Sequence, residues 1–115
     1  MTNHQLELDR AFQALADPAR RGMVERLTHG PASVSDLAQP LSMSLPSVMQ
    51  HLAMLEQAGL VRSKKQGRVR TCELDLAGLS RAEQWINQRR REWEQRLDLL
   101  GDYLKTIESE GDGDA

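Results

Sequence analysis

Hydrogen-bonding side chains are spaced along one segment whose other residues are largely apolar. They are Ser44, Ser47, Gln50 and His51. At about 100° per residue, Ser47 and Gln50 fall together on one side of a helix, and the side opposite them is aliphatic. The aliphatic side holds Leu45, Val48, Leu52 and Leu55, with Met49 beside them. A helix face that is short, uncharged and able to hydrogen-bond can approach base edges in the major groove of DNA, so we expect that chemistry from residues 44–57.

Each polar residue of this segment has its own expected contact. Gln50 can pair with N6 and N7 of adenine, and Ser47 can donate a hydrogen bond to a base or a phosphate. Met54 falls on the same side, which Pro46 and His51 flank. Ser44 is alternatively only the helix N-cap, and Pro46 falls in the first turn, where a missing N–H costs little. For His51 two interpretations stay open, a phosphate contact or a hydrogen bond to nearby backbone.

A second chemical feature is a cluster of basic residues that follows this helix. Residues 60–74 hold five cations and one acid, Glu73. Gln66-Gly67 signals a turn between two partly alternating runs, so a β-hairpin with a basic tip is predicted. Because side chains alternate along a strand, the cations cannot all face one way, and Arg68 beside the turn is the best candidate for a groove contact. The candidates for phosphate contacts are Lys64, Lys65, Arg68 and Arg70. The alternative is a solvated basic edge that guards against aggregation.

Two arginines stand together earlier in the chain, at the expected start of a helix. Arg20 is the candidate for a further phosphate contact, with Arg21 beside it. The alternative for either residue is an ion pair with Asp17 or Asp36.

The other residues that carry chemistry are few and scattered. The chain has one cysteine, Cys72, and three histidines. His4, His29 and His51 lack metal-like spacing, and a lone cysteine can form neither an internal disulfide nor, by itself, a structural zinc site. The sequence shows no spacing typical of a nucleophile and its base, no glycine-rich phosphate loop and no paired carboxylates. We therefore expect neither an enzyme nor a bound cofactor or metal.

The composition is that of one small globular domain. The chain has 115 residues, of which 39% are hydrophobic and 28% charged, as in proteins that bury a single core. No run approaches the roughly 18 apolar residues that span a membrane, so we expect no membrane partner. A single cysteine fits a reducing cytoplasm. The net charge of −2 indicates no partner, but the basic hairpin does.

Periodicity and capping residues predict the elements that position these side chains. A first helix is expected over about 5–16, and Asp17-Pro18 reads as the N-cap and first residue of a second helix that runs to about 28. Ser33 or Ser35 caps a short third helix that ends before Pro40. A tight connection over 41–43 then leads to the helix over 44–57.

From about 76 to 110 the pattern is helical again. Its later apolar residues recur at spacings of 4, 3, 4 and 3, a seven-residue repeat that needs a partner surface. We expect that partner to be a second copy of the chain. The expected dimer contacts on this helix are Trp93, Leu97, Leu100, Leu104 and Ile107. Residues 107–115 are expected to be an acidic, disordered tail, which leaves 1–106 as the domain.

Three stretches together resemble one family. Residues 14–21, Ala-Leu-Ala-Asp-Pro-Ala-Arg-Arg, resemble the opening of ArsR-type winged-helix repressors. Residues 34–38 and 44–52 are similar to the helix-turn-helix of that family, and 55–61 to its exit into the wing. The likeness is close over about 11–75 and weaker over 93–98.

The resemblance implies a mainly α fold with a small β-hairpin, a winged helix-turn-helix whose N- and C-terminal helices form a dimer interface. It thereby adds Leu8 and Phe12 of the first helix to the expected dimer contacts. It implies a homodimeric transcriptional repressor whose partner is double-stranded DNA. Helix 44–57 would enter the major groove, and the 60–74 hairpin would be the wing. Two such helices ~34 Å apart would read an inverted-repeat operator.

The resemblance also bears on what the protein senses. Many members of the family sense metals, and one class carries Cys-Val-Cys where this chain has Ser33, Val34 and Ser35. Hydroxyls are poor ligands for soft metals, so the resemblance is to a branch without the metal motifs, and the inducer is open. The alternatives are a protein-interaction or oligomerisation module, a non-repressing architectural DNA binder, and a redox- or ligand-responsive sensor that uses Cys72 or a cleft between the terminal helices.

Overall fold

The computed structural model describes the backbone of residues 3–113 and the side chains of residues 5–111. Contacts divide the chain into two units, one that ends at Ala82 and one that begins at Glu83. The division falls inside the last helix, and each unit is described by itself. Helices with one small antiparallel sheet confirm the predicted fold class.

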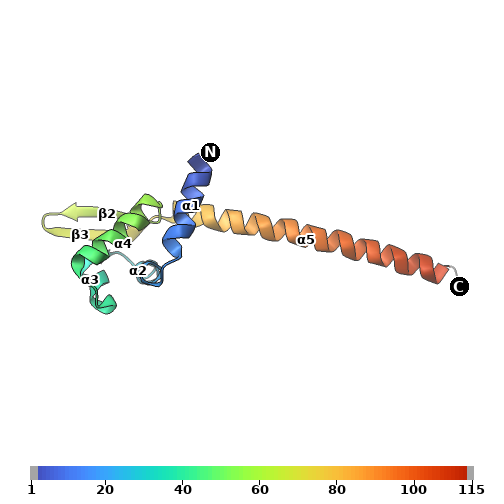
Figure 1. Cartoon of the computed structure of the whole chain (residues 1–115), viewed down its shortest axis with the longest axis horizontal. Coiled ribbons are helices and arrows are strands. Elements are labelled where there is room, and N and C mark those ends of the chain that lie inside the picture. Colours follow the sequence, from blue (N-terminus) through green and yellow to red (C-terminus); the bar gives the residue numbers. More distant parts are fainter. Residues whose placement is uncertain (1–2, 114–115) are drawn as a thin grey trace. The chain divides into compact units, whose positions relative to one another are not determined.

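The first unit holds the helices and the sheet, and Figure 1 shows α4 beside the hairpin of β2 and β3. The elements, in chain order, are α1 (Asn3–Leu15), α2 (Pro18–Leu27), β1 (Ala32–Ser33), α3 (Val34–Ala38), a 3-10 helix η1 (Gln39–Leu41), α4 (Leu45–Gln57), β2 (Val61–Gln66), β3 (Val69–Leu74) and the start of α5 (Leu76–Gly113).

Polar caps start the helices, as the sequence predicts. The Oδ2 atom of Asp17 accepts a hydrogen bond from the backbone N–H of Arg20 at 3.0 Å, and Ser44 Oγ accepts from the backbone N–H of Ser47 at 3.3 Å. Both helices also carry a proline within their first two positions. Each cap satisfies an N–H that has no partner within its own helix.

The connection between α3 and α4 contains a turn that the sequence analysis did not predict. Of the two candidate caps for α3, the structure uses Ser33. The helix ends at Ala38, before Pro40 as predicted, but η1 follows directly. Pro40 fits the first turn of this tighter helix, because no N–H is needed there. Ser42 then adopts a left-handed φ of 51°, which turns the chain into α4.

The sheet has the strand order β1-β3-β2, with both pairings antiparallel. The predicted hairpin is present, and Gly67 at its turn has a positive φ of 62°. In its register Ser63 pairs with Cys72 and Lys65 pairs with Arg70. Strand β1 was not predicted, because its two residues are too few to show alternation.

The core of this unit forms where α4 meets the other elements. Val48, Leu52 and Leu55 of α4 are almost completely buried, together with Leu60 and Cys72 of the hairpin segment. The aliphatic side predicted for this helix is therefore the core side over its last three positions.

The first positions of that aliphatic side are not buried. Leu45 is 53% exposed and Met49 is 40% exposed, although both were predicted on or beside the core face. They lie in the first turns of α4, where they line a hollow together with Val34 and the exposed hairpin residues Lys65 and Val69.

Gly78 explains how α5 joins the first unit. A Cβ at this position would lie 2.5 Å from the carbonyl oxygen of Gly59, and the Gly78 N–H donates to that same oxygen at 3.1 Å. Only a residue without a side chain fits so close an approach. The helix starts at Leu76, where Asp75 Oδ1 accepts from the N–H of Ala77 at 3.1 Å.

The second unit is the remainder of α5. The helix continues to Gly113, so residues 107–113 are helical where the sequence predicted a disordered tail. Leu104 and Ile107 extend the helical stripe into this segment, and its glutamates are good helix formers. Asp114 and Ala115 lie outside the described residues. No helix in the described part of the chain is both long and apolar enough to cross a membrane.

The core position of Leu55 gives a stability prediction. Leu55→Ala should lower the free energy of unfolding by about 2–5 kcal/mol, because the mutation leaves a cavity in a packed core. Leu76→Ala, at a residue that is 65% exposed, is the control and should change it by less than about 0.5 kcal/mol. Urea denaturation followed by circular dichroism measures both, and equal losses would contradict this account of the core.

Candidate nucleic-acid interface

The outer side of α4 places Ser47 and Gln50 together. Gln50 is exposed, and its amide has no hydrogen-bond partner within the described residues. Ser47 Oγ accepts a hydrogen bond from Ser44 Oγ at 3.0 Å, which leaves the Ser47 hydroxyl proton free to donate. Ser44 itself is occupied as the N-cap. The two groups able to contact a base edge are therefore Ser47 and Gln50, with exposed Pro46 beside them.

Arg20 is half-buried, and its guanidinium is hydrogen-bonded within the protein. Its Nε donates to the carbonyl oxygen of Ala14 at 2.7 Å, its Nη2 to that of Gln13 at 3.2 Å, and its Nη1 lies 3.2 Å from Nδ1 of His51. The guanidinium thus joins the end of α1 to the middle of α4. Its side-chain hydrogen bonds therefore go to these three acceptors rather than to Asp17 or Asp36, the ion-pair partners considered from the sequence.

His51 is a half-buried residue between two charged groups. Its Nδ1 faces Arg20 and also lies 3.9 Å from Oδ2 of Asp17. The pKa of the Asp17 carboxyl is lowered, first by the hydrogen bond from the backbone N–H of Arg20 and then, against the effect of desolvation, by the charge of Arg20. The sequence analysis named backbone or phosphate as the partner of His51, but the partner within the chain is the Arg20 side chain.

The hairpin register divides its cations between two faces. Lys65 and Arg70 are cross-strand partners, and Lys64 pairs with Thr71 on the opposite face. Arg68 follows Gly67 at the turn. The prediction that the cations cannot share one face is confirmed by this register. Lys64, Lys65 and Arg68 are exposed, whereas Arg70 is half-buried.

Arg70 is tied to α4 through two further side chains. Its Nη1 donates to Ser63 Oγ at 2.9 Å, and Ser63 in turn donates to the carboxylate of Glu56. This chain of hydrogen bonds fixes the hairpin against α4. Arg70 is therefore less available for a phosphate than its three exposed neighbours.

A hollow of about 440 Å³ lies between the first turns of α4 and the tip of the hairpin. Its apolar wall includes Leu45, Met49 and Val69, and its cations are Lys65, Arg68 and Arg70. The polar side of α4 and the basic tip of the hairpin thus border one concave surface in the first unit.

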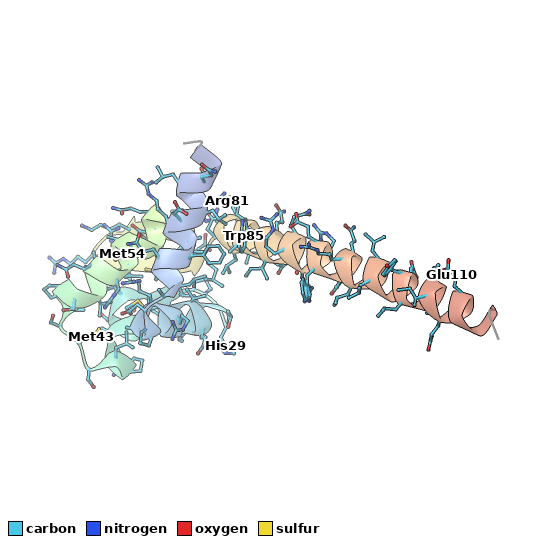
Figure 2. All side chains as sticks on the ribbon, turned by 45° about the vertical axis from the view of Figure 1, so that its right-hand side comes forward. His29, Met43, Met54, Arg81, Trp85 and Glu110 are labelled. Carbon is cyan, nitrogen blue, oxygen red and sulfur yellow. The ribbon has the colours of Figure 1, made fainter. Side chains whose placement is uncertain are left out.

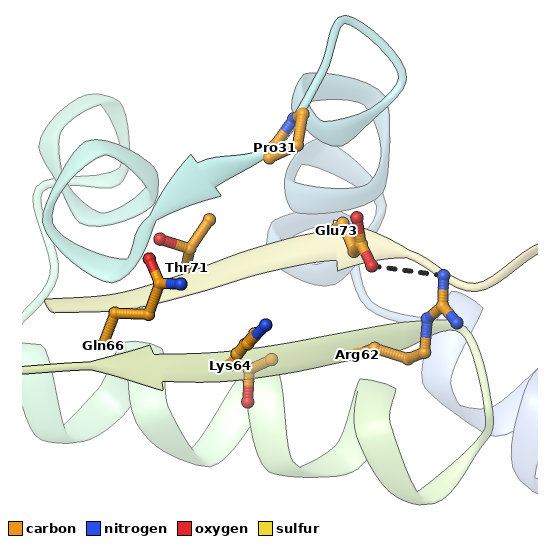
Figure 3. Close-up of a pocket in the computed structure, with 7 residues that line it drawn as sticks. Pro31, Arg62, Lys64, Gln66, Thr71 and Glu73 are labelled. Atoms are coloured by element: carbon orange, nitrogen blue, oxygen red, sulfur yellow. Dashed lines mark ion pairs between the residues drawn. The ribbon is translucent and has the colours of Figure 1, made fainter.

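A second hollow, of about 500 Å³, lies on the opposite face of the sheet (Figure 3). Lys64, Gln66 and Thr71 line it, and Arg62 forms an ion pair with Glu73 at its edge, with 3.2 Å between Nη2 and Oε1. The carboxylate of Glu73 offsets one of the two cations in this hollow. It therefore has less positive charge than the hollow beside α4, which has three cations and no acid.

Cys72 is buried in the core. Burial raises the pKa of its thiol, and the charge of Glu56 raises it further, while Arg70 acts in the opposite direction. A raised pKa keeps the thiol protonated and unreactive at neutral pH, which opposes redox sensing at this residue.

One of the residues considered for metal binding, Ser33, has another role in this structure. The Ser33 hydroxyl caps α3 by accepting from the N–H of Asp36 at 3.1 Å. Among the described residues, no three His, Cys, Asp or Glu side chains gather where they could hold a metal ion. His4 lies outside the described side chains.

The seven-residue repeat of α5 is exposed throughout the second unit. Figure 2 shows side chains standing out around this helix from Trp85 to Glu110. Its exposed apolar residues include Trp93, Leu97, Leu100, Leu104 and Ile107. Trp85 lies under the guanidinium of Arg89, with 5.0 Å from Cζ to the ring centroid. In the first unit, Phe12 is 36% exposed and Leu8 is half-buried.

Comparison with known sequences gives relatives along most of the chain. The family model described as a helix-turn-helix domain matches residues 15–64. The chain is 44% identical over 104 residues to the HTH-type transcriptional regulator Rv2034 of Mycobacterium tuberculosis, an alignment that covers 90% of this chain and 92% of the relative. It is 28% identical over 79 residues to the transcriptional repressor SdpR of Bacillus subtilis, which covers 69% of this chain and 88% of that protein.

Solved structures extend the likeness to the fold. The crystal structure of the ArsR family transcriptional regulator RHA00566 matches with a TM-score of 0.76 and 46% identity, over 82% of this chain and 97% of that chain. An ArsR-like transcriptional regulator from Rhodococcus sp. RHA1 matches with a TM-score of 0.73 and 30% identity, over 86% of this chain and 93% of that one. The chain therefore belongs to the ArsR family of winged helix-turn-helix, DNA-binding transcriptional regulators.

Proposed function

We propose that the protein is a homodimeric transcriptional repressor that binds an inverted-repeat operator, with α4 in the major groove and the β2–β3 hairpin as wing. The observation that carries the proposal is the surface shared by α4 and the hairpin tip. Ser47 and Gln50 are outward on a helix side without acids, and Lys65 and Arg68 border the hollow next to it. Groups that can form hydrogen bonds with bases therefore lie beside cations that can contact phosphates.

Within this surface, Gln50 supplies the sequence-specific contact. A free amide can accept from N6 and donate to N7 of one adenine, and this bidentate geometry discriminates against other bases. The free hydroxyl proton of Ser47 adds a donor. Lys64, Lys65 and Arg68 contact the phosphate backbone, which positions the protein without reading the sequence.

The dimer forms through the exposed repeat of α5, with Leu8 and Phe12 of α1 contributing. A helix with an apolar stripe at seven-residue spacing is stable in water when the stripe packs against another helix. Two copies related by a twofold axis present two α4 helices to successive major grooves, so the operator is an inverted repeat. Bound at a promoter, such a dimer excludes polymerase.

DNA binding tests the proposal directly. Duplexes selected by the purified protein from a random pool should share an inverted repeat. Fluorescence anisotropy should show tight, salt-sensitive binding to that repeat and weak binding to a scrambled duplex. The titration is repeated with zinc, and a change of affinity would contradict the absence of a metal site. Failure to prefer any duplex would favour a protein-interaction module.

Two substitutions separate base reading from phosphate binding. Gln50→Ala should cost about 1–3 kcal/mol of operator binding and relax the preference at one base position. Arg68→Ala should weaken binding to all duplexes alike and reduce the slope of log affinity against log salt by about 0.9. Gln57→Ala and Arg62→Ala are matched controls on the same two elements and should leave operator affinity within about twofold. Equal loss of affinity in the variants and their controls would count against these roles.

The repeat of α5 gives a prediction about assembly. Leu97→Glu should convert the dimer to a monomer, because it places a charge in the apolar stripe. Leu99→Glu, at an exposed residue outside the stripe, is the matched control and should remain dimeric. Sedimentation equilibrium measures both, and a wild-type chain that is monomeric at micromolar concentration would refute the dimer.

The burial of Cys72 makes redox control a testable alternative. We expect its thiol to react with Ellman's reagent only slowly in the native protein and rapidly in urea, because burial and a raised pKa suppress the thiolate. Operator affinity should be unchanged by mild peroxide. Rapid native labelling together with loss of DNA binding on oxidation would instead identify a redox sensor.

A further inference from the structure

Arg20 occupies a position that direct contact with DNA does not explain. Two of its guanidinium nitrogens donate to the carbonyl oxygens of Gln13 and Ala14, at 3.2 and 2.7 Å. These carbonyls belong to the last turn of α1. That of Gln13 also accepts from the backbone N–H of Ala16 at 3.2 Å, whereas that of Ala14 stands four residues before Pro18, which has no N–H to donate. A cation at this end also complements the helix dipole. A turn of the guanidinium toward a phosphate would break both bonds.

The third nitrogen of the group sets the state of His51. Arginine has only donors, so the 3.2 Å approach of Nη1 to Nδ1 makes Nδ1 an acceptor. A proton on Nδ1 would point at the guanidinium. The neutral ring therefore carries its proton on Nε2. The other charged group that faces the ring, Asp17, lies farther away, with Oδ2 3.9 Å from Nδ1.

The Nε2–H group remains available for a ligand. Within the described residues it has no hydrogen-bond partner, and Nε2 is not among the buried polar atoms that lack one. Solvent therefore reaches it. His51 follows Gln50 directly on α4, so this donor stands next to the residue that we propose reads the bases.

We propose that Arg20 is a positioning residue that acts on DNA binding through His51: it holds Nδ1 as an acceptor so that Nε2–H donates to an operator phosphate. The inference rests on the proposed function, because it needs the outer side of α4 to face DNA. It replaces the direct phosphate contact that the sequence suggested for Arg20. The ligand of Nε2–H is a phosphodiester oxygen, which accepts hydrogen bonds. Because the hydrogen bond from Arg20 fixes the ring, Nε2–H is its single donor to this oxygen.

Operator titrations across a salt series separate this role from direct contact. Arg20→Gln and Arg20→Lys should each weaken binding about tenfold, with the slope of log affinity against log salt unchanged. A lysine keeps the charge but cannot hold three acceptors in one plane. If Arg20 contacts phosphate itself, Arg20→Lys stays near wild type and Arg20→Gln loses about 0.9 of slope; that result would overturn the inference.

A double-mutant cycle shows whether Arg20 works through His51. In a His51→Ala background, Arg20→Gln should have less than about a twofold further effect. Arg21→Gln is the matched control, because Arg21 also donates to a carbonyl at the end of α1, that of Leu15 at 2.8 Å, but has no hydrogen bond to His51. It should leave operator affinity unchanged. Independent effects of Arg20 and His51 would refute the coupling.

Two further measurements keep the test decisive if Arg20 variants fold poorly. In ¹⁵N spectra of the histidine-labelled full chain, His51 should show a protonated Nε2 and an unprotonated Nδ1, with its signals assigned from their loss in His51→Gln.

His51→Gln, whose amide nitrogen lies near the Nε2 position, should keep affinity within about threefold, and His51→Asn should lose about tenfold. The opposite tautomer, or equal loss in both variants, would overturn the inference. A wild-type chain that prefers no duplex would refute the proposed function itself, and the inference with it.

Discussion

The burial of one side of α4 is the constraint on which the rest of the first unit depends. Val48, Leu52 and Leu55 are removed almost completely from water, and a rotation of the helix about its axis would expose them at a cost of roughly 1.5–3 kcal/mol for each side chain. Because this rotation is fixed, the side that carries Gln50 must face outward. Burial of the apolar side of α4 thus determines which side faces outward. The side chains on that outward side have no packing role.

Arginines then hold the neighbouring elements to α4. Arg20 joins it to the end of α1 through His51, and Arg70 joins it to the hairpin through Ser63 and Glu56. A planar guanidinium with five donors suits such bridges, because it can serve several acceptors from one fixed orientation. Both residues look like phosphate ligands in the sequence, but both are bound within the protein. Among the predicted phosphate contacts, the exposed ones are Lys64, Lys65 and Arg68 at the hairpin.

The last helix combines two surfaces with different requirements. Its first turn is packed so closely against Gly59 that Gly78 cannot carry a side chain. Beyond Ala82 the helix exposes an apolar stripe that includes Trp93, Leu97 and Leu104. Contiguous apolar surface of this kind marks an association site in soluble proteins, and the seven-residue spacing fits another helix. We therefore infer that the same helix carries the contact between two copies and, at its other end, the support of the DNA-binding unit.

Local patterns were enough to predict most elements of the fold. Caps such as Asp17 and Ser44, the Gln66-Gly67 turn and the period of α4 depend on neighbouring residues, so they can be read along the chain. The two-residue strand β1 and the turn η1 were missed, because they exist only through pairing with β3 and the fit of Pro40. The exposure of Leu45 was also decided beyond local pattern. The helical state of residues 107–113 follows local features, the stripe of α5 and its glutamates, which outweigh the acidic composition that suggested disorder.

The candidate site divides in the same way. The sequence by itself determined which residues form the polar side of α4 and which cations stand at the hairpin, because periodicity and turn position place them. Only the tertiary structure decided which cations are free. Arg20 and Arg70 meet carbonyl, imidazole and hydroxyl acceptors that lie 6 to 31 residues away in the chain. A long flexible side chain takes the partner that packing brings within reach, and residue order along the chain carries no record of that distance.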